Sequence, residues 1–208
     1  MLQLSAIDTS TLELLKKLMS FDEFASLRLV GGTALALKIG HRKSVDLDLF
    51  GEIDFESVNT TTVFSEFEHV SILKKSKNIN IYSIDGIKVD FVNYSYPWLQ
   101  DQLLIEGIRL AGIKDIAAMK LAAITGRGSK KDFTDIFFLL QKYSLKEMIG
   151  FYNEKYFDGS EFLALKSLAY FADAEKDASL EMLIDVSWDK IKNTILEHLR
   201  KYNKETEK

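Results

Sequence analysis

Apolar and polar residues alternate in short runs through the first half of the chain and recur at helical spacing through the second half. Short alternating runs are typical of β-strands, whereas apolar residues three or four positions apart are typical of amphipathic helices. The expected strands are residues 27–30, 45–49, 79–84 and 87–92. The expected helices of the first half lie near residues 9–25, 33–39 and 56–68. Residues 114–203 are expected to be almost wholly helical, so the pattern predicts an α+β protein.

Three groups of apolar residues in the second half have helical spacing. Such stripes form the buried face of a helix far more often than they contact a cofactor. We therefore assign them to the core of a helical bundle: Leu145, Met148, Ile149 and Tyr152; Phe162, Leu165, Leu168 and Phe171; and Trp188, Ile191, Ile195 and Leu199.

The single proline, Pro97, marks the change from the mixed half to the helical half. A chain of 208 residues is long enough for one domain or a small pair. The residue before a proline is restricted to extended conformations, which favours a boundary between elements at this point. We expect a core with a mixed sheet over residues 1–100 and a helical domain over residues 101–208.

Two aspartates, Asp46 and Asp48, are the most informative residues of the chain. In an extended strand they point to one face, while Val45, Leu47 and Leu49 point to the other. Two neighbouring carboxylates repel each other unless a cation lies between them, and oxygen ligands suit Mg²⁺. The alternative is a polar strand face that is open to water.

A glycine pair precedes this acidic strand. Gly31 and Gly32 allow a tight turn into a helix-prone segment, and Thr33 is placed to cap that helix. The unpaired N–H groups and the dipole of a helix N-terminus attract phosphate. Most Gly-Gly pairs are only turns, so the proximity of the acidic strand is what favours a phosphate site here.

A third carboxylate lies on a later strand. The dipeptide Asp85-Gly86 predicts a hairpin turn, and the returning strand places Lys88 and Asp90 on the face opposite Ile87, Val89 and Phe91. Asp90 thus repeats the pattern of the first pair. A single aspartate opposite an apolar row is also typical of a solvated strand.

Taken together, these segments resemble the nucleotidyltransferases of the DNA polymerase β-like superfamily, and within it the AbiEii/AbiGii type found as toxins of toxin–antitoxin and phage-defence systems. The resemblance spans roughly residues 27–140. The matching blocks are residues 31–35, residues 40–50, Asp90, residues 115–124 and residues 127–136. The implied fold is a small mixed sheet that carries the aspartates, together with a helical C-terminal bundle.

The resemblance implies roles for the residues of the sheet. Asp46, Asp48 and Asp90 would bind catalytic Mg²⁺ or Mn²⁺, and Asp90 would also help to activate the acceptor hydroxyl. Gly31, Gly32 and Thr33 would hold the phosphates of a nucleoside triphosphate (NTP). Such an arrangement fits phosphoryl chemistry that is assisted by metal ions.

The second block carries charged residues on predicted helices. Lys120 lies on a mostly apolar helix, where a lysine often extends its amine to water; the resemblance instead implies a contact to phosphate or a catalytic role. Arg127 follows at the helix end, near the implied nucleotide site. Ser129 and Asp132 have the spacing of a helix-capping pair, and the resemblance places Asp132 at or beside the nucleotide. Asp135 would hold a neighbouring lysine or arginine.

Three further residues precede the acidic strand. Arg42 suits a triphosphate, because a planar guanidinium matches phosphate oxygens in two places. His41 is expected to be a solvated loop residue rather than a base. Ser44 would contact a phosphate or merely end the loop.

Composition limits the classes of partner. A formal net charge of −4 argues against duplex DNA as a ligand. It leaves room for RNA along a local basic stripe, although each lysine cluster is more often a solvated face. The candidate stripe contains Lys74, Lys75, Lys77, Arg127, Lys130 and Lys131. No stretch approaches a membrane span, the start lacks the pattern of a signal peptide, and the chain has no cysteine, so a cytoplasmic location is expected.

The expected function is transfer of a nucleoside monophosphate from an NTP to an acceptor hydroxyl. By analogy with toxin relatives, the acceptor is a tRNA 3′ end and a cognate antitoxin opposes the activity. Two alternatives remain open from the sequence. The acceptor is a protein or a small molecule, or the chain is a nucleotide-binding module without catalysis.

Overall fold

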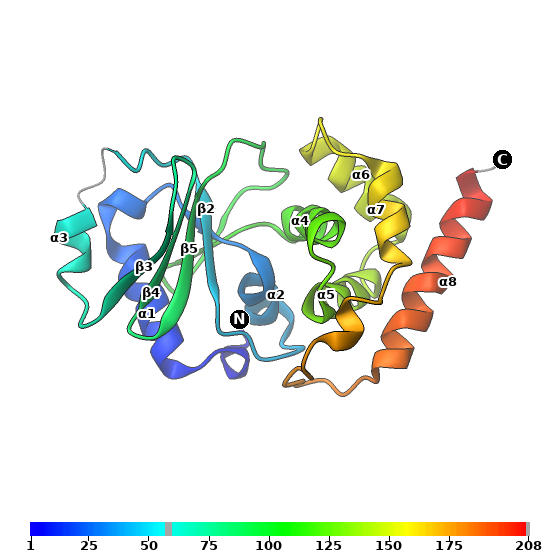
Figure 1. Ribbon diagram of the computed structural model, residues 1–208, viewed down its shortest axis with the longest axis horizontal. Coiled ribbons are helices and arrows are strands. Elements are labelled where there is room, and N and C mark those ends of the chain that lie inside the picture. Colours follow the sequence, from blue (N-terminus) through cyan, green and yellow to red (C-terminus); the bar gives the residue numbers. More distant parts are fainter. Residues whose placement is uncertain (57–59, 207–208) are drawn as a thin grey trace. The chain divides into compact units, whose positions relative to one another are not determined.

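The computed structural model describes residues 1–56 and 60–206 (Figure 1). The chain divides into two compact units, one made of Met1–Tyr96 and Asp101–Ala111 and the other of Pro97–Gln100 and Gly112–Lys208. This division differs from the predicted domains 1–100 and 101–208, because the chain passes between the units three times.

The first unit is built on a seven-stranded sheet in the order β3-β4-β5-β2-β1-β7-β6. The pairs β2–β5 and β1–β7 are parallel and the other neighbours are antiparallel, so the sheet is mixed as predicted. The strands are β1 Arg28–Leu29, β2 Leu47–Gly51, β3 Val70–Lys75, β4 Ile79–Ile84, β5 Ile87–Asn93, β6 Leu103–Ile105 and β7 Ile108–Leu110.

The β4–β5 hairpin follows the sequence prediction. Asp85 and Gly86 have φ of 49° and 83°, which are the positive values that a tight two-residue hairpin turn requires. Val89 and Phe91 are buried on one face of β5, while Lys88 and Asp90 alternate with them and are only partly buried. The turn therefore fixes the face on which Asp90 lies.

Short helices complete the first unit. They are η1 Leu4–Ala6, α1 Thr9–Ser20, η2 Asp22–Phe24, α2 Gly31–Ile39 and α3 Thr60–Phe64. The helix predicted over residues 9–25 ends at Ser20, and a separate 3-10 turn follows. The helix predicted from residue 33 begins at Gly31. Part of the helix predicted near residues 56–68 falls on residues 57–59, outside the described residues.

The second unit is helical. Its elements are α4 Ile113–Gly126, α5 Lys130–Leu140, α6 Leu145–Lys155, α7 Glu161–Leu168, η3 Ala174–Lys176 and α8 Trp188–Thr206. Residues 177–187 contain no helix, so the expectation of an almost wholly helical half was too broad. Among the described residues, no helix has both the length and the apolar character needed to span a bilayer.

The predicted apolar stripes are partly confirmed. The four residues of the α6 stripe are all buried, and Ile191 and Ile195 of α8 are buried as well. The stripe on α7 is confirmed at Leu168, which is fully buried, but was wrong at Phe162, whose side chain is 75% exposed, because α7 turns Ala164 inward together with Leu168.

A buried ion pair ties the crossing segment Pro97–Gln100 to the helices of the second unit. Lys155 Nζ lies 2.8 Å from Asp115 Oδ1, and both side chains are fully buried. The carboxylate of Asp115 also accepts the backbone N–H of Leu99 and of Gln100, at 2.9 and 3.1 Å, and Lys155 donates to the carbonyl of Pro97. Each charge is therefore satisfied, as burial requires.

Candidate active site

Asp48 and Asp90 are direct neighbours in the parallel pairing of β2 with β5. Neighbouring strands lie roughly 4.8 Å apart, and residues paired in this way project to the same face. The flanking residues Leu47, Leu49 and Val89 are buried on the opposite face. The two carboxylates are thus held side by side by an apolar core behind the sheet.

Asp46 lies just before this strand rather than within it. The strand begins at Leu47, and Val45 is 56% exposed. The predicted apolar row of three residues was therefore wrong at Val45, because the alternation of a strand starts two residues later. The carbonyl of Asp46 accepts a hydrogen bond from Thr33 Oγ1, which fixes the backbone at this position.

Gly31 approaches the carboxylate of Asp48 so closely that no side chain fits. A Cβ on Gly31 would lie 2.2 Å from Asp48 Oδ2, and the residue has φ of +68°. The N–H of the preceding residue, Val30, donates to the carbonyl of Asp48 at 2.9 Å. The glycine turn is thereby joined to the acidic strand, and the helix α2 begins directly from it.

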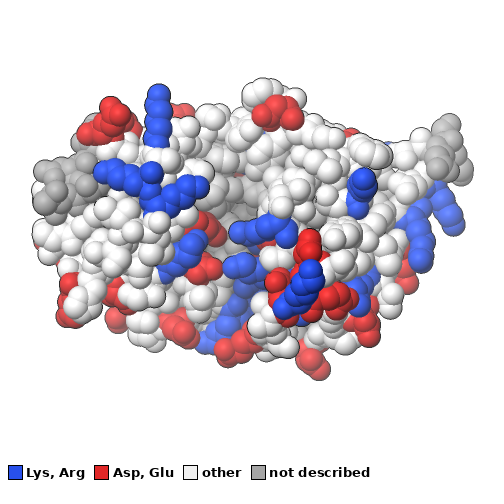
Figure 2. Space-filling model, viewed as in Figure 1, with Lys and Arg blue, Asp and Glu red and all other residues white. Residues whose placement is uncertain are grey.

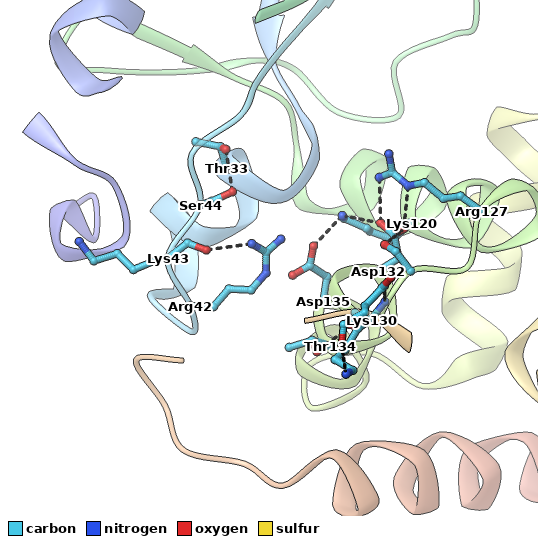
Figure 3. A network of polar contacts seen from close by, with 12 residues as sticks. Thr33, Arg42, Lys43, Ser44, Lys120, Arg127, Lys130, Asp132, Thr134 and Asp135 are labelled. Atoms are coloured by element: carbon cyan, nitrogen blue, oxygen red, sulfur yellow. Dashed lines mark hydrogen bonds and ion pairs between the residues drawn. The ribbon is translucent and has the colours of Figure 1, made fainter. Parts of the chain in front are cut away.

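Thr33 and Ser44 form part of the support beneath this turn (Figure 3). Their hydroxyl oxygens lie 2.8 Å apart, and both residues are buried. Thr33 does not cap α2 as predicted, since Val30 is the N-cap residue and Thr33 lies within the first turn. Ser44 also donates its backbone N–H to the carbonyl of Ala6 at 2.9 Å. The two hydroxyls therefore hold the loop onto the helix.

His41 and Arg42 are buried, with exposed fractions of 0% and 3%. The expectation that His41 is a solvated loop residue was wrong, because the segment folds back against the protein. Arg42 Nη1 donates to the carbonyl of Lys43 at 2.9 Å (Figure 3). The amine of Lys43 in turn pairs with Asp8. Arg42 thus stabilises the backbone of the loop that leads into the acidic strand.

Lys88 is a neighbour of the aspartates that sequence reasoning did not single out. Its Nζ lies 2.5 Å from Asp90 Oδ1. Residues two apart on a strand share a face, so the spacing of Lys88 and Asp90 already contained the signal. The lysine balances part of the negative charge beside Asp48.

The donor chemistry fits a hard divalent cation such as Mg²⁺ or Mn²⁺, which prefer oxygen ligands. Asp48 and Asp90 are adjacent in the sheet, and Asp46 offers a third carboxylate just before the strand. Within the described residues, no three side chains of His, Cys, Asp or Glu already form a metal-binding group. A bound ion would therefore have to draw Asp46 into the existing pair.

A second charged cluster lies in the helical unit. Lys120 Nζ lies 3.0 Å from Asp132 Oδ1 and 2.6 Å from Asp135 Oδ2, and the side chains are 4%, 0% and 0% exposed. Lys120 does not extend to water, so that alternative was wrong. The prediction that Asp135 holds a neighbouring cation is confirmed.

Asp132 is the centre of this cluster (Figure 3). Arg127 donates to both its carboxylate oxygens, at 2.8 and 3.1 Å, and Ser129 Oγ donates at 2.6 Å. Burial by itself would raise the pKa of Asp132, but the charge of Lys120 and the contacts of Arg127 and Ser129 hold that pKa well below its ordinary value. Ser129 is the N-cap residue of α5, yet its hydroxyl bonds the carboxylate rather than a backbone N–H.

Arg127 differs from its partners in exposure. Its side chain is 61% exposed, whereas the carboxylate that it grips is fully buried. A guanidinium fixed along one edge by a carboxylate presents its remaining surface in a defined orientation. The structure therefore brings together Gly31, Asp48 and Asp90 in the first unit, and Lys120, Arg127 and Asp132 in the second.

Comparisons with known proteins agree with this fold. An uncharacterised protein of Aquifex aeolicus (strain VF5) is 37% identical over 196 residues, which cover 91% of this chain and 94% of that protein. A provisionally assigned nucleotidyltransferase from Helicobacter pylori has a similar structure, with a TM-score of 0.61, 20% identity, and coverage of 96% of this chain and 97% of that one. MenT4, a nucleotidyltransferase toxin from Mycobacterium tuberculosis H37Rv, has a TM-score of 0.55 at 13% identity, with coverage of 91% and 81%.

Family membership rests on the sequence. Residues 13–206 match the model of the family described as nucleotidyl transferase AbiEii toxin of type IV toxin–antitoxin systems. The solved structures share the α+β fold, which confirms the predicted fold class. The predicted resemblance is likewise confirmed: the chain belongs to the AbiEii nucleotidyltransferase toxin family.

Proposed function

We propose that this protein transfers a nucleoside monophosphate from an NTP to a hydroxyl at the 3′ end of tRNA and releases pyrophosphate. The observation that carries the proposal is the pairing of Asp48 with Asp90, with Gly31 packed against the carboxylate of Asp48. Two adjacent carboxylates beside the N-terminus of a helix combine a cation site with a phosphate site.

The first unit would hold the divalent ion and the triphosphate. Asp46, Asp48 and Asp90 would bind Mg²⁺ or Mn²⁺, which supplies charge neutralisation at the phosphates. The backbone N–H groups at Gly31 and Gly32 would bind phosphate oxygens, because the first N–H groups of a helix lack partners within the helix. Asp90 lies on β5, on the side of β2 away from Gly31, and would accept the proton of the attacking hydroxyl.

Thr33, Ser44 and Arg42 support this site from beneath. The first two are buried and bonded to each other, and Arg42 is bonded to the backbone of the same loop. These contacts favour positioning of the glycine turn and of Asp46 over direct contact with the nucleotide. Their removal would then alter nucleotide binding through the backbone that they hold.

The cluster in the second unit would supply a cation for phosphate. Lys120 is enclosed by two carboxylates, so we assign it the role of holding Asp132 in place of the predicted phosphate contact. Asp132 in turn orients the exposed guanidinium of Arg127, which is suited to bind phosphate oxygens. Membership in a toxin–antitoxin family also supports a cognate antitoxin as the regulator of this activity.

The test is label transfer from each of the four α-labelled NTPs in the presence of Mg²⁺ and total bacterial tRNA. The Asp48→Asn variant serves as the blank. Label on RNA with the wild type but not with the variant would support the proposal and identify the nucleotide. Label that appears only on added proteins or small molecules would move the acceptor to another class. Absence of pyrophosphate release with every acceptor would favour a binding module.

A further inference from the structure

Four residues form one row across four neighbouring strands of the sheet. Asp48 pairs with Asp90, Asp90 pairs with Ile81, and Ile81 pairs with Lys74. Residues directly paired across strands project to the same face. Lys74 therefore lies on the aspartate face, two strands from Asp90, which corresponds to roughly 10 Å between their Cα atoms.

A bulge in β3 places Lys74 in this row. The register between β3 and β4 shifts between Ile72 and Lys74, so that the strand gains one residue at Leu73. In regular pairing Leu73 would lie opposite Ile81. A shift of one residue exchanges the two faces of a strand, so the bulge brings Lys74 to the aspartate face and turns Lys75 to the other. Lys75 accordingly pairs with Asn80, which is buried.

Lys74 is accessible to a ligand. From Ser71 onward every residue of β3 is exposed, and β3 is the outermost strand of the sheet on this side. No residue that the structure describes forms an ion pair with Lys74, whereas Lys88 in the next row of the same face contacts Asp90. Figure 2 shows Lys and Arg side chains gathered over the upper part of strands β3–β5.

The order of the strands places Gly31 and Lys74 on opposite sides of the aspartates, so two substrates could reach the aspartates from different sides. Gly31 follows β1, which flanks β2 on one side, while β5, β4 and β3 follow on the other. A triphosphate bound at Gly31 would therefore lie on the far side of Asp48 from Lys74. The position beside Asp90 and toward Lys74 is left for the second substrate.

We infer that Lys74 positions the acceptor RNA strand by binding a backbone phosphate upstream of the 3′ end that reaches Asp90. The inference rests on the proposed function and adds the path of the acceptor. A single-stranded RNA end carries one charge per nucleotide, which suits a lysine set two strands away from the reacting hydroxyl. RNA is favoured over an acidic peptide because Lys74 lies in the same cross-strand row as Asp90 and Asp48, the carboxylates at which the proposed transfer to tRNA would take place.

The test compares Lys74→Gln with Lys75→Gln. Both residues are exposed lysines on the same strand, and both changes remove one charge, but only Lys74 lies on the aspartate face. Steady-state transfer is measured with total bacterial tRNA as the varied substrate and then with the NTP varied. Binding of labelled tRNA in the absence of NTP is measured by anisotropy over a range of salt concentrations.

We expect Lys74→Gln to raise the KM for tRNA about fivefold, and to lower the slope of log affinity against log salt by about 0.7, as loss of one phosphate contact predicts. The kcat and the KM for NTP should stay unchanged. Lys74→Arg should restore the KM for tRNA. Lys75→Gln should change it less than about twofold, because a charge on the other face supplies only long-range attraction.

Equal effects of the two variants would overturn the inference while leaving the proposed function intact if label still reaches tRNA. A further outcome is that Lys74→Gln binds tRNA more weakly than the wild type, while the wild type transfers no label to tRNA. That result would support binding of tRNA at Lys74 and would refute the proposed nucleotidyl transfer to tRNA. A wild-type protein that binds an acidic peptide pool through Lys74 but not tRNA would overturn the RNA assignment.

Discussion

The backbone of Gly31 and the carboxylate of Asp48 are in direct contact, since a Cβ on Gly31 would lie 2.2 Å from Asp48 Oδ2. Gly31 also has φ of +68°, in the left-handed region that residues with a Cβ rarely adopt. The absence of a side chain thus serves both the turn and the acidic strand, and it would tie the proposed phosphate site to the proposed metal site.

We predict that Gly31→Ala lowers transfer activity at least 100-fold. The left-handed backbone costs an alanine about 1–2 kcal/mol, and the added methyl group displaces the carboxylate of Asp48. Activity and thermal unfolding are measured on the same preparation. Gly150→Ala is the matched control: Gly150 lies inside α6 with open space around its Cβ, so this change should stabilise the protein by up to about 1 kcal/mol and leave activity unchanged. Full activity of Gly31→Ala would contradict the proposed phosphate site.

We predict that Asp48→Asn and Asp90→Asn each reduce transfer by about 10²–10³-fold, because an amide is a poor ligand for a divalent cation and cannot take up a proton. The double variant should lose little more than either single one, since the two groups act as a unit. Mg²⁺ titrations of activity measure the change. Asp85→Asn removes the same charge from the hairpin turn, where asparagine tolerates positive φ, and should remain active.

The residues around this pair show what a sequence can and cannot predict. The hairpin at Asp85-Gly86 and the shared face of Lys88 and Asp90 follow from local rules, because turn chemistry and two-residue alternation act between near neighbours. The burial of His41 and the bond of Thr33 to the carbonyl of Asp46 depend on how the loop before the acidic strand folds back, which no local pattern records. The bulge at Leu73 depends on a partner strand and was likewise not predicted.

We predict that Lys120→Met destabilises the helical unit by about 3–5 kcal/mol, since it removes the ammonium group that contacts the fully buried carboxylates of both Asp132 and Asp135. Arg127→Gln should cost less than about 1 kcal/mol, because the side chain of Arg127 is 61% exposed. Urea unfolding followed by tryptophan fluorescence reports on this unit, which holds both tryptophans, Trp98 and Trp188. Equal losses for the two variants would refute this ranking.

The low pKa of Asp132 predicts how stability depends on pH. A carboxyl whose pKa is depressed by folding stabilises the native state above its unfolded pKa of about 3.9, and that contribution is lost as the pH falls toward the folded value. Wild type should therefore exceed Asp132→Asn in stability by a constant amount between pH 5 and 7, and the difference should shrink below about pH 4. Urea midpoints of both proteins at pH 6 and pH 3 measure it. A difference that does not depend on pH would argue against the ionised carboxylate as the source.

The interleaved path of the chain has a consequence for dissection of this protein. A gene cut after codon 100 would give an N-terminal fragment without β6 and β7, so that β1 would lose its parallel neighbour and become an unprotected edge. The complementary fragment would lack the segment Pro97–Gln100, whose N–H groups and carbonyl satisfy Asp115 and Lys155. The N-terminal fragment would thus expose the edge of β1, and the C-terminal fragment would contain Asp115 and Lys155 without these hydrogen-bond partners. We therefore expect neither fragment to fold as the intact chain does, so a functional split of this toxin would need its break inside a loop of one unit.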